Sequence, residues 1–411
     1  MSDCCSQPGL LPFEQALAQM LEDITPVAET ITVAVTQAAQ CVLANDIVSP
    51  INVPPHHNSA MDGYAYAQSS LEQSTTLVMV GKSFAGAPYQ GEVKAGECIR
   101  IMTGAKLPSD CDTVQMQENC TADNNKISFN KKSQQGQHVR YAGEDVSLGH
   151  KIYEKGHRLT SVDIGMLTSV GVGKVEVYRP IKVALIATGD ELKSPEQPLL
   201  EGDIYESNSS FLAPMLKKLN CDVINFGIIA DDLSKIRQAF ISADEQADVV
   251  ISSGGVSVGE ADYTKDVLDE LGEIGFWKIA IKPGKPFAFG KLANSIFFGL
   301  PGNPVSALAT FYQLSVHGIH KLQNAAPIKR QRFKVKTTTL LKKSRGRTDF
   351  QRGVVTVNAQ GEMEVASTGS QGSGILSSIA RANCFIILEQ DRGRVEIGEL
   401  VDVELFDDCL K

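Results

Sequence analysis

Between residues 181 and 271, three apolar runs alternate with three segments of helical periodicity. The runs are KVALIAT, DVINFGII and DVVISS, and the helical patterns cover 208–219, 233–243 and 263–271. Each run is apolar along most of its length, which is typical of strands that are buried on both faces. Strands of this kind that alternate with helices predict a parallel sheet covered by helices on both sides. We assign this α/β domain to residues 180–328.

The rest of the chain predicts smaller domains. Short β-rich runs between Gly, Pro and Asn turns indicate a small β domain over 50–145. The segments 10–49 and 146–179 mix helical and extended patterns, and we expect them to pair into one discontinuous α+β domain. Strands such as CFIILE and LVDVELF predict a C-terminal β domain over 329–411. The fold class is therefore α/β multidomain: a central parallel-sheet domain, two small β-rich domains and a discontinuous α+β domain.

Length and charge limit the functions open to this chain. At 411 residues it is too long for one ordinary core. A net charge of −9 argues against sequence-independent binding of nucleic acid, which depends on cationic surface. No apolar run reaches the ~18 residues that span a bilayer, and the start MSDCCSQPGL lacks the features of a secretion signal. We expect a cytoplasmic protein with neither nucleic acid nor membrane as a partner.

Cysteines and histidines give little sign of a metal site. The nine cysteines are widely scattered without a CxxC pair, so we expect reduced thiols. His56 and His57 are adjacent and should point to opposite sides of an extended chain. His317 and His320 share a helix face, but with no third ligand nearby we interpret them as surface residues.

Unusual residues follow three of the predicted strands of the α/β domain. In an open parallel sheet, ligands bind beyond the carboxyl ends of the strands. The three strand ends read ATGDELK (187–193), SSGGVSVGEAD (252–262) and GLPGNPVSA (299–307). Glycine lets backbone N–H groups approach an anion, and the helix that should start after Asn303 and Pro304 adds a favourable dipole. These strand ends predict a binding site for an anionic ligand.

A lysine pair and three carboxylates extend this prediction. Lys282 and Lys285 flank a Pro-Gly turn, and two fixed ammonium groups suit a small dianion. Glu191, Glu260 and Asp262 offer the oxygen ligands that Mg²⁺ prefers in combination with phosphates. Together these residues indicate phosphate-ester or phosphoanhydride chemistry.

Each feature also has a plain structural interpretation. A Gly-Gly pair is most often only a turn, and single lysines are mostly solvated surface charges. Asp262 fits a helix N-cap, and Asn303 followed by Pro304 fits an N-cap with proline at the first helical position. The functional interpretation is preferred because three such strand ends should meet at one sheet edge.

Seven motifs in a fixed order give the chain a resemblance to a known family. They are NSAMDGYA (58–65), RIMTGA (100–105), GEDV (143–146), TGDEL (188–192), SSGGVSVGEADYTK (252–265), KPGKPFAFG (282–290) and GLPGNPVSA. In this order they resemble the molybdopterin molybdenumtransferases, which are related to the E domain of gephyrin. The resemblance extends from about residue 13 to residue 406 and implies an elongated, four-domain subunit that dimerises.

The resemblance also implies a composite site, in which the small β domain of one chain faces the α/β domain of the other. The implied catalytic residues are Asp62, Glu191, Asp262, Lys282 and Lys285. Those implied for substrate binding are Thr103, Asp145, Asp231, Ser253, Gly254, Gly255, Ser257, Pro301, Asn303 and Pro304. Lys282, Lys285, Arg352 and Ser373 would bind molybdate, and Glu191 and Asp262 would bind magnesium. Some relatives carry a Ser-Arg pair where this chain has Gly374 and Ile375, so any role of that arginine is lost here.

The reaction implied by the resemblance is insertion of molybdate into adenylyl-molybdopterin, with Mg²⁺-assisted cleavage of the pyrophosphate link and release of AMP. Expected partners are a second copy of the chain, a molybdopterin adenylyltransferase, and molybdoenzymes or their chaperones. Two alternatives stay open. The α/β domain alone also resembles molybdopterin adenylyltransferase, and a non-enzymatic scaffold, as in gephyrin, is the other.

Overall fold

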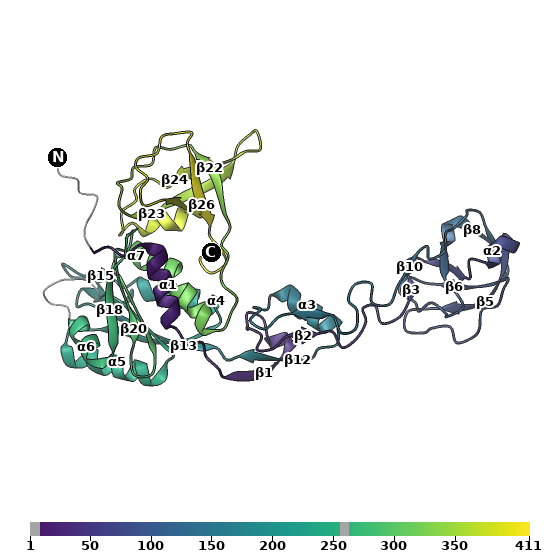
Figure 1. Cartoon of the computed structure of the whole chain (residues 1–411), viewed down its shortest axis with the longest axis horizontal. Helices are drawn as coiled ribbons and strands as arrows, with labels where there is room; N and C mark the ends of the chain where they lie inside the picture. The colour runs from purple at the N-terminus through teal and green to yellow at the C-terminus, as the bar shows by residue number, and fades with distance from the viewer. Residues whose placement is uncertain (1–8, 255–262) are drawn as a thin grey trace.

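The computed structural model describes residues 9–254 and 263–411. The molecule is elongated (Figure 1). The central α/β domain and the C-terminal β domain lie together at one end, a small middle domain follows, and the small β domain stands at the other end. No helix in the described part of the chain is long and apolar enough to cross a membrane.

The central sheet has the strand order β16-β13-β17-β21-β20-β18. Four strands run parallel, as predicted: β13 (Ile181–Thr188), β16 (Cys221–Ile229), β17 (Val249–Ser253) and β21 (Ile296–Leu300). The remaining two, β18 (Glu273–Lys278) and β20 (Pro286–Lys291), form an antiparallel hairpin at one edge. The carboxyl ends of the four parallel strands therefore meet at one edge of the sheet.

Helices cover both faces of this sheet, as predicted. One face carries α1 (Phe13–Asp23), α4 (Asn208–Lys218), α7 (Pro304–Thr310) and α8 (Val316–Leu322), with a π-helical turn at Phe311–Ser315 between the last two. The other face carries α5 (Leu233–Gln246) and α6 (Tyr263–Leu271). Apolar side chains of the strands and helices form one core on each side.

The surface position expected for His317 and His320 is wrong. Both residues are partly buried on α8, and burial lowers the pKa of His317 to about 4 and that of His320 to about 3. Arg330 contributes a further repulsion to His317 because its guanidinium approaches the ring. Both imidazoles are therefore neutral at pH 7.

The middle domain is made of two separated chain segments. Strand β1 (Thr30–Ala34) pairs antiparallel with β12 (Lys174–Tyr178), and β2 (Ile47–Val48) pairs with β11 (Lys151–Tyr153). Helix α3 (Ser161–Ser169) begins with a capping box between Thr160 and Asp163. Helix α1, which we had placed in this domain, instead packs in the central core, because Phe13, Ala16 and Met20 are buried against it.

The small β domain is built on one six-stranded sheet with the order β7-β4-β6-β5-β9-β8. Its strands are β4 (Gly63–Tyr66), β5 (Thr76–Ser83), β6 (Glu97–Ile101), β7 (Thr113–Met116), β8 (Cys120–Asp123) and β9 (Lys126–Phe129). The short strands β3 (Asn58–Ser59) and β10 (Val139–Arg140) pair beside it, and α2 covers Ser70–Gln73. Two apolar clusters on this sheet give the domain its own core.

The C-terminal domain is built on a third six-stranded sheet, which includes one strand from the central domain. Its own elements are β22 (Arg332–Thr337), β23 (Thr348–Val357), β24 (Met363–Ser367), α9 (Leu376–Arg381), β25 (Cys384–Leu388) and β26 (Leu400–Leu405). Strand β19 (Ile281–Lys282) joins its edge, parallel to β23. The Lys-Pro-Gly-Lys turn that follows β19 is therefore held by both domains. All seven cysteines in the described ranges are free thiols.

Candidate active site

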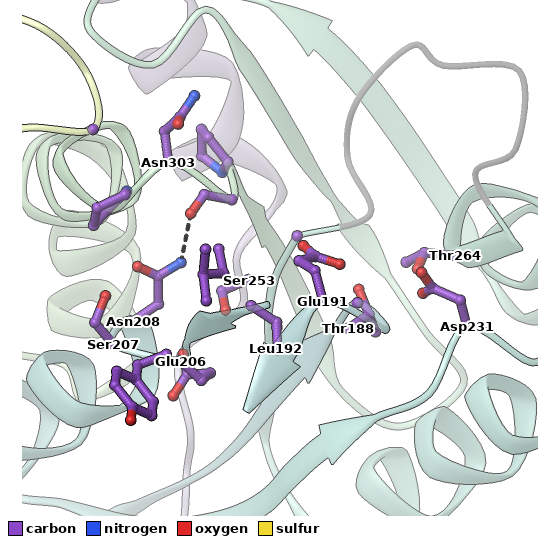
Figure 2. A pocket seen from close by; sticks show the side chains of 18 of the residues that line it. Thr188, Glu191, Leu192, Glu206, Ser207, Asn208, Asp231, Ser253, Thr264 and Asn303 are labelled. Carbon is purple, nitrogen blue, oxygen red and sulfur yellow. Dashed lines mark hydrogen bonds between the residues drawn. The ribbon is translucent and has the colours of Figure 1, made fainter. Parts of the chain in front are cut away.

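A cavity of about 720 Å³ opens at the carboxyl ends of the parallel strands. Thr188 ends β13, Ser253 ends β17, and Asp231 and Pro301 follow the ends of β16 and β21. Figure 2 shows these strand ends with the side chains that line the cavity. The structure thus brings together seven of the residues expected at the site: Glu191, Asp231, Ser253, Gly254, Pro301, Asn303 and Pro304.

The loop after β13, which contains Asp190 and Glu191, and the loop after β16, which contains Asp231, are joined by hydrogen bonds. The backbone N–H of Asp231 donates to Asp190 Oδ1 (3.0 Å), and the N–H of Asp190 donates to Asp231 Oδ2 (3.4 Å). Glu191 follows on the same loop, and Gly189, two residues before it, has a φ of +146°. A Cβ at Gly189 would lie 2.6 Å from Glu191 Oε2, so a larger residue there would displace this carboxylate from its present position. Glu191 and Asp231 therefore present carboxylate oxygens at the cavity wall (Figure 2).

Polar atoms without a hydrogen-bond partner lie in the same wall. Ser253 Oγ and Asn208 Oδ1 are buried and lack a partner among the described residues. Asn208 is held in place because its Nδ2 donates to Gly302 O (2.9 Å), as the dashed line in Figure 2 shows. A buried polar group without a partner is costly, so these two atoms suit a bound ligand or water.

Glycine at 254 allows a close approach of two strand ends. Its φ is +95°, and a Cβ there would lie 2.8 Å from Thr188 O. On the next strand end, Asn303 is the N-cap residue of α7 and Pro304 its first residue, as predicted, although the Asn303 side chain makes no capping hydrogen bond. The backbone of Gly254 and the start of α7 thus form one side of the cavity.

Neither Lys282 nor Lys285 lines the cavity. Pro286, which directly follows Lys285, does line it. Lys282 Nζ forms an ion pair with Asp349 Oδ2 in the C-terminal domain, at 3.2 Å. Gly284 between the lysines has a φ of +102° and packs against Thr310 of α7, where a Cβ would collide with Oγ1. The turn is therefore pressed against α7, beside the cavity.

Arg352 holds the loop that contains Gly372 by a hydrogen bond. Its side chain is fully buried, and it donates from Nε to Ser378 Oγ and from Nη2 to Gly372 O, both at 3.0 Å. Burial lowers the pKa of Arg352 to about 10. The backbone of this loop reaches the cavity, since Ser373 O accepts the N–H of Val305 (3.0 Å) and Gly374 lines the wall.

Three expected residues, Asp62, Thr103 and Asp145, belong to the segment 50–145, whose sheet stands at the opposite end of the molecule from the central domain (Figure 1). Asp62 accepts hydrogen bonds from Thr103, and these bonds hold the pKa of its carboxyl below the ordinary value, the backbone N–H having the larger effect. Asp145 is exposed and its backbone N–H donates to Val53 O (3.1 Å). One chain therefore does not bring these residues to its own cavity.

Four further expectations, at Gly255, Ser257, Glu260 and Asp262, lie outside the described residues. Conversely, the structure adds residues that the sequence interpretation missed. Asn208 was seen only as a helix start, and Thr188, Glu206 and Thr264 were not assigned any role, yet all four line the cavity. Thr188 could have been found, since it opens the TGDEL motif that marks a strand end.

Three family models match the chain in succession. The MoeA N-terminal region (domain I and II) matches residues 11–171, a molybdopterin-binding domain model matches 184–321, and the MoeA C-terminal region (domain IV) matches 334–406. A molybdopterin molybdenumtransferase of Haemophilus influenzae is 49% identical over 98% of this chain and 100% of its own length. The chain belongs to the molybdopterin molybdenumtransferase family.

Further relatives agree with this family in sequence and in structure. A Dictyostelium discoideum gephyrin is 30% identical over 96% of this chain and 62% of its own length. The crystal structure of a molybdopterin biosynthesis MoeA protein from Pyrococcus horikoshii has a TM-score of 0.84 and 30% identity, and covers 97% of this chain and all of that one. The multidomain fold of the molybdenumtransferase family is thus that of this chain.

Proposed function

We propose that this protein is a transferase of molybdenum cofactor biosynthesis that inserts molybdate into adenylyl-molybdopterin and releases AMP. Full-length similarity to a molybdopterin molybdenumtransferase supports the reaction class. The observation that carries the proposal is the cavity at the strand ends, which combines the carboxylates of Glu191 and Asp231 with the backbone of Gly254 and the start of α7. Such a cavity suits a phosphorylated ligand next to a divalent cation.

Within this proposal the uncharged residues Gly254, Ser253 and Asn208 of the cavity wall bind the substrate. The approach of strand ends at Gly254 leaves backbone groups accessible to phosphate oxygens. Ser253 Oγ can donate or accept, and Asn208 Oδ1 accepts, so both suit the N–H and O–H groups of a pterin or a ribose. Because Asn208 is fixed by Gly302, its acceptor is positioned before the ligand binds.

The carboxylates fit a magnesium ion. Glu191 and Asp231 offer only oxygen donors, and Mg²⁺ commonly uses one or two carboxylates together with water and substrate phosphates. The described residues contain no group of three acidic, His or Cys side chains that would form a complete protein cage. Bound there, magnesium would neutralise charge on the leaving phosphate. We propose Glu191 and Asp262, the latter outside the described residues, as its ligands, and Asp231 as a substrate-binding residue.

Molybdate is proposed to bind at Lys282 and Lys285, on the turn that leads into the cavity wall at Pro286. Gly284 sets the curvature of this turn and Thr310 supports it, so the two lysines are placed before the anion arrives. Arg352 and Ser373 are proposed to contribute through the loop that they hold at the start of α7.

We further propose a homodimer in which the small β domain of one chain supplies Asp62, Thr103 and Asp145 to the cavity of the other. In Figure 1 the small β domain stands at the opposite end of the molecule from the central domain of the same chain, which supports this arrangement. The enzyme would act in the cytoplasm, receive its substrate from a molybdopterin adenylyltransferase, and pass the cofactor to molybdoenzymes or their chaperones.

The direct test supplies purified protein with adenylyl-molybdopterin, molybdate and Mg²⁺ and measures AMP release and cofactor formation. Wild-type protein should release AMP, and Glu191→Gln should fold normally but lose most of this activity. Adenylylation of molybdopterin from ATP would instead favour the adenylyltransferase. Absence of both reactions would favour a scaffold.

A further inference from the structure

Asp349 of the C-terminal domain lies directly beside Lys282. Strand β19 pairs in parallel with β23, and the register places Ile281 opposite Thr348 and Lys282 opposite Asp349. The N–H of Thr348 donates to Ala280 O (2.8 Å), which fixes the two backbones across the domain boundary. The position of Lys282 is therefore set by the C-terminal domain as well as by its own turn.

The two members of this ion pair differ strongly in exposure. The side chain of Asp349 is 3% exposed, whereas that of Lys282 is 39% exposed. Asp349 Oδ2 accepts from Lys282 Nζ (3.2 Å) and from Gln351 Nε2 (3.0 Å), while Oδ1 is buried without a partner in the described residues. A buried carboxylate needs a nearby cation, so the ammonium of Lys282 is held on the side of Asp349.

Two further cations surround Asp349 but direct their donors elsewhere. Lys343 Nζ donates to backbone carbonyls, including Arg392 O (2.9 Å), and Arg352 donates to Ser378 and Gly372. Burial is the main cause that lowers the pKa of both Lys343 and Arg352, and the charge of Asp349 opposes this shift in each. Among these three cations, Lys282 is the one that forms a direct ion pair with Asp349 in the described part of the chain.

We propose that Asp349 is a positioning residue that holds Lys282 and weakens its attraction for the incoming oxyanion. An ammonium has three donors, so the bond to Asp349 leaves two for a tetrahedral oxyanion. The adjacent negative charge lowers the affinity of the ground state, because it partly cancels the field of the lysine. If the enzyme binds the anion too tightly before transfer, the KM for the anion falls, but kcat falls as well because the ground state is stabilised more than the transition state.

This inference rests on the proposed function, since it assumes that Lys282 contacts the molybdate substrate. The variant Asp349→Asn keeps the volume and an acceptor oxygen but removes the charge. The matched control is Glu404→Gln, another fully buried carboxylate of the same domain that pairs with Arg330 and Arg332 rather than with a lysine of the turn. Asp349→Ser is a second charge-free variant, for use if the asparagine protein does not fold.

Sodium molybdate alone is titrated into each variant by calorimetry, and KM and kcat for molybdate are measured separately, with melting temperatures as a check on folding. Asp349→Asn should bind molybdate about tenfold more tightly and show lower KM and lower kcat. Glu404→Gln should lower the melting temperature and leave both constants unchanged. Lys282→Ala should weaken molybdate binding.

The outcomes separate the inference from the proposed function. If Lys282→Ala weakens binding while Asp349→Asn leaves it unchanged or weakens it, Asp349 is merely a structural ion-pair partner and the inference is wrong. If Lys282→Ala and Lys285→Ala both leave molybdate binding unchanged, the anion binds elsewhere and the molybdate site of the proposed function fails. Parallel loss of stability and activity in Asp349→Asn and Glu404→Gln would also overturn the inference.

Discussion

Asp62 accepts two hydrogen bonds from one residue, Thr103: the backbone N–H donates at 2.7 Å and Oγ1 at 2.8 Å. These bonds hold the carboxyl pKa below its ordinary value, with the backbone bond as the main cause. Asp62 therefore stays ionised at lower pH than an ordinary aspartate, and the stabilisation from these bonds is lost only as the pH falls through the depressed pKa. The bonds from Thr103 therefore keep the Asp62 carboxyl negatively charged at neutral pH.

Replacing Thr103 by valine should shift the pH dependence of the reaction. The variant keeps the backbone donor and removes the hydroxyl, so the pKa of Asp62 should rise towards its ordinary value. The acidic limb of the rate profile should then move to higher pH, and an NMR titration of the Asp62 carboxyl should show the same shift. Thr103→Ser, which keeps the hydroxyl, serves as the control. An unmoved acidic limb in the valine variant would exclude a role for this bond.

Mixed dimers test whether the site is shared between chains. Asp62→Asn removes a charge in the small β domain and Glu191→Gln one in the central domain, so each homodimer should have little activity. In a heterodimer one of the two composite sites is free of both changes, and about half of the wild-type rate per such dimer should return. Co-expression with two affinity tags yields the heterodimer for the assay. Heterodimers as inactive as their parents would show that the site is not composite.

Two adjacent serines of β17 should respond differently to alanine. Ser252 Oγ donates to Gly254 O (3.3 Å), whereas Ser253 Oγ is buried without a partner in the described residues. Ser252→Ala should lower the free energy of unfolding by about 0.5–1.5 kcal/mol. Ser253→Ala should cost little or no stability but weaken AMP binding several-fold, as measured by calorimetry. Equal AMP affinity in wild type and Ser253→Ala would remove Ser253 from the site.

Gly284→Ala should disturb the lysine turn. The new Cβ meets Thr310 Oγ1, and the φ of +102° is unfavourable for any side chain, so we expect a loss of roughly 1–3 kcal/mol in stability. The KM for molybdate should rise because both lysines shift. Gly361→Ala is the control. Gly361 lies in the loop between β23 and β24 and also has a positive φ, +82°, but a Cβ there would meet no atom within 4 Å. A normal molybdate KM in Gly284→Ala would show that the turn does not place the anion.

The junction between the central and C-terminal domains contains a buried ion pair whose loss should be costly. The side chains of Arg330 and Glu404 are 4% and 0% exposed. Arg330→Met leaves the Glu404 charge with less compensation and should lower the free energy of unfolding by about 3–5 kcal/mol. Arg394→Met, which breaks a pair with Glu396 in which both side chains are more than 60% exposed, should cost less than about 1 kcal/mol. Denaturant titrations measure the free energy of unfolding of both variants. Similar losses in Arg330→Met and Arg394→Met would show that burial of the ion pair makes no difference.

Hydrophobic periodicity was sufficient to predict the central domain but not its edges. Helices α4, α5 and α6 follow directly from their patterns, because the apolar positions of a helix face its sheet wherever that sheet lies. The apolar pattern of β18 and β20 does not show whether these strands pair parallel or antiparallel. The packing of helix α1 on the central domain could not be predicted, because its docking surface is formed by residues hundreds of positions later in the chain.

The site was predictable where parallel strands dictate proximity. Glu191, Asp231 and Gly254 meet because the carboxyl ends of neighbouring parallel strands share an edge. The pairing of Lys282 with Asp349 could not be foreseen, since it depends on a two-residue strand that crosses a domain boundary. Asn208 escaped notice because nothing local distinguishes a helix start that lines a cavity from one that does not.

The packing of α1 on the central domain has a consequence for synthesis on the ribosome. Leu11 exchanges backbone hydrogen bonds with Lys278 and Ala280, and the ring of Phe13 packs 5.5 Å from that of Phe350. A nascent chain thus emerges with its first helix long before any partner for its apolar face has been translated. The middle and small β domains, which occupy residues 30–178, can fold during this interval. The central domain, in contrast, closes only after nearly the whole chain has been made, so its amino-terminal helix is the segment that a chaperone has most time to bind.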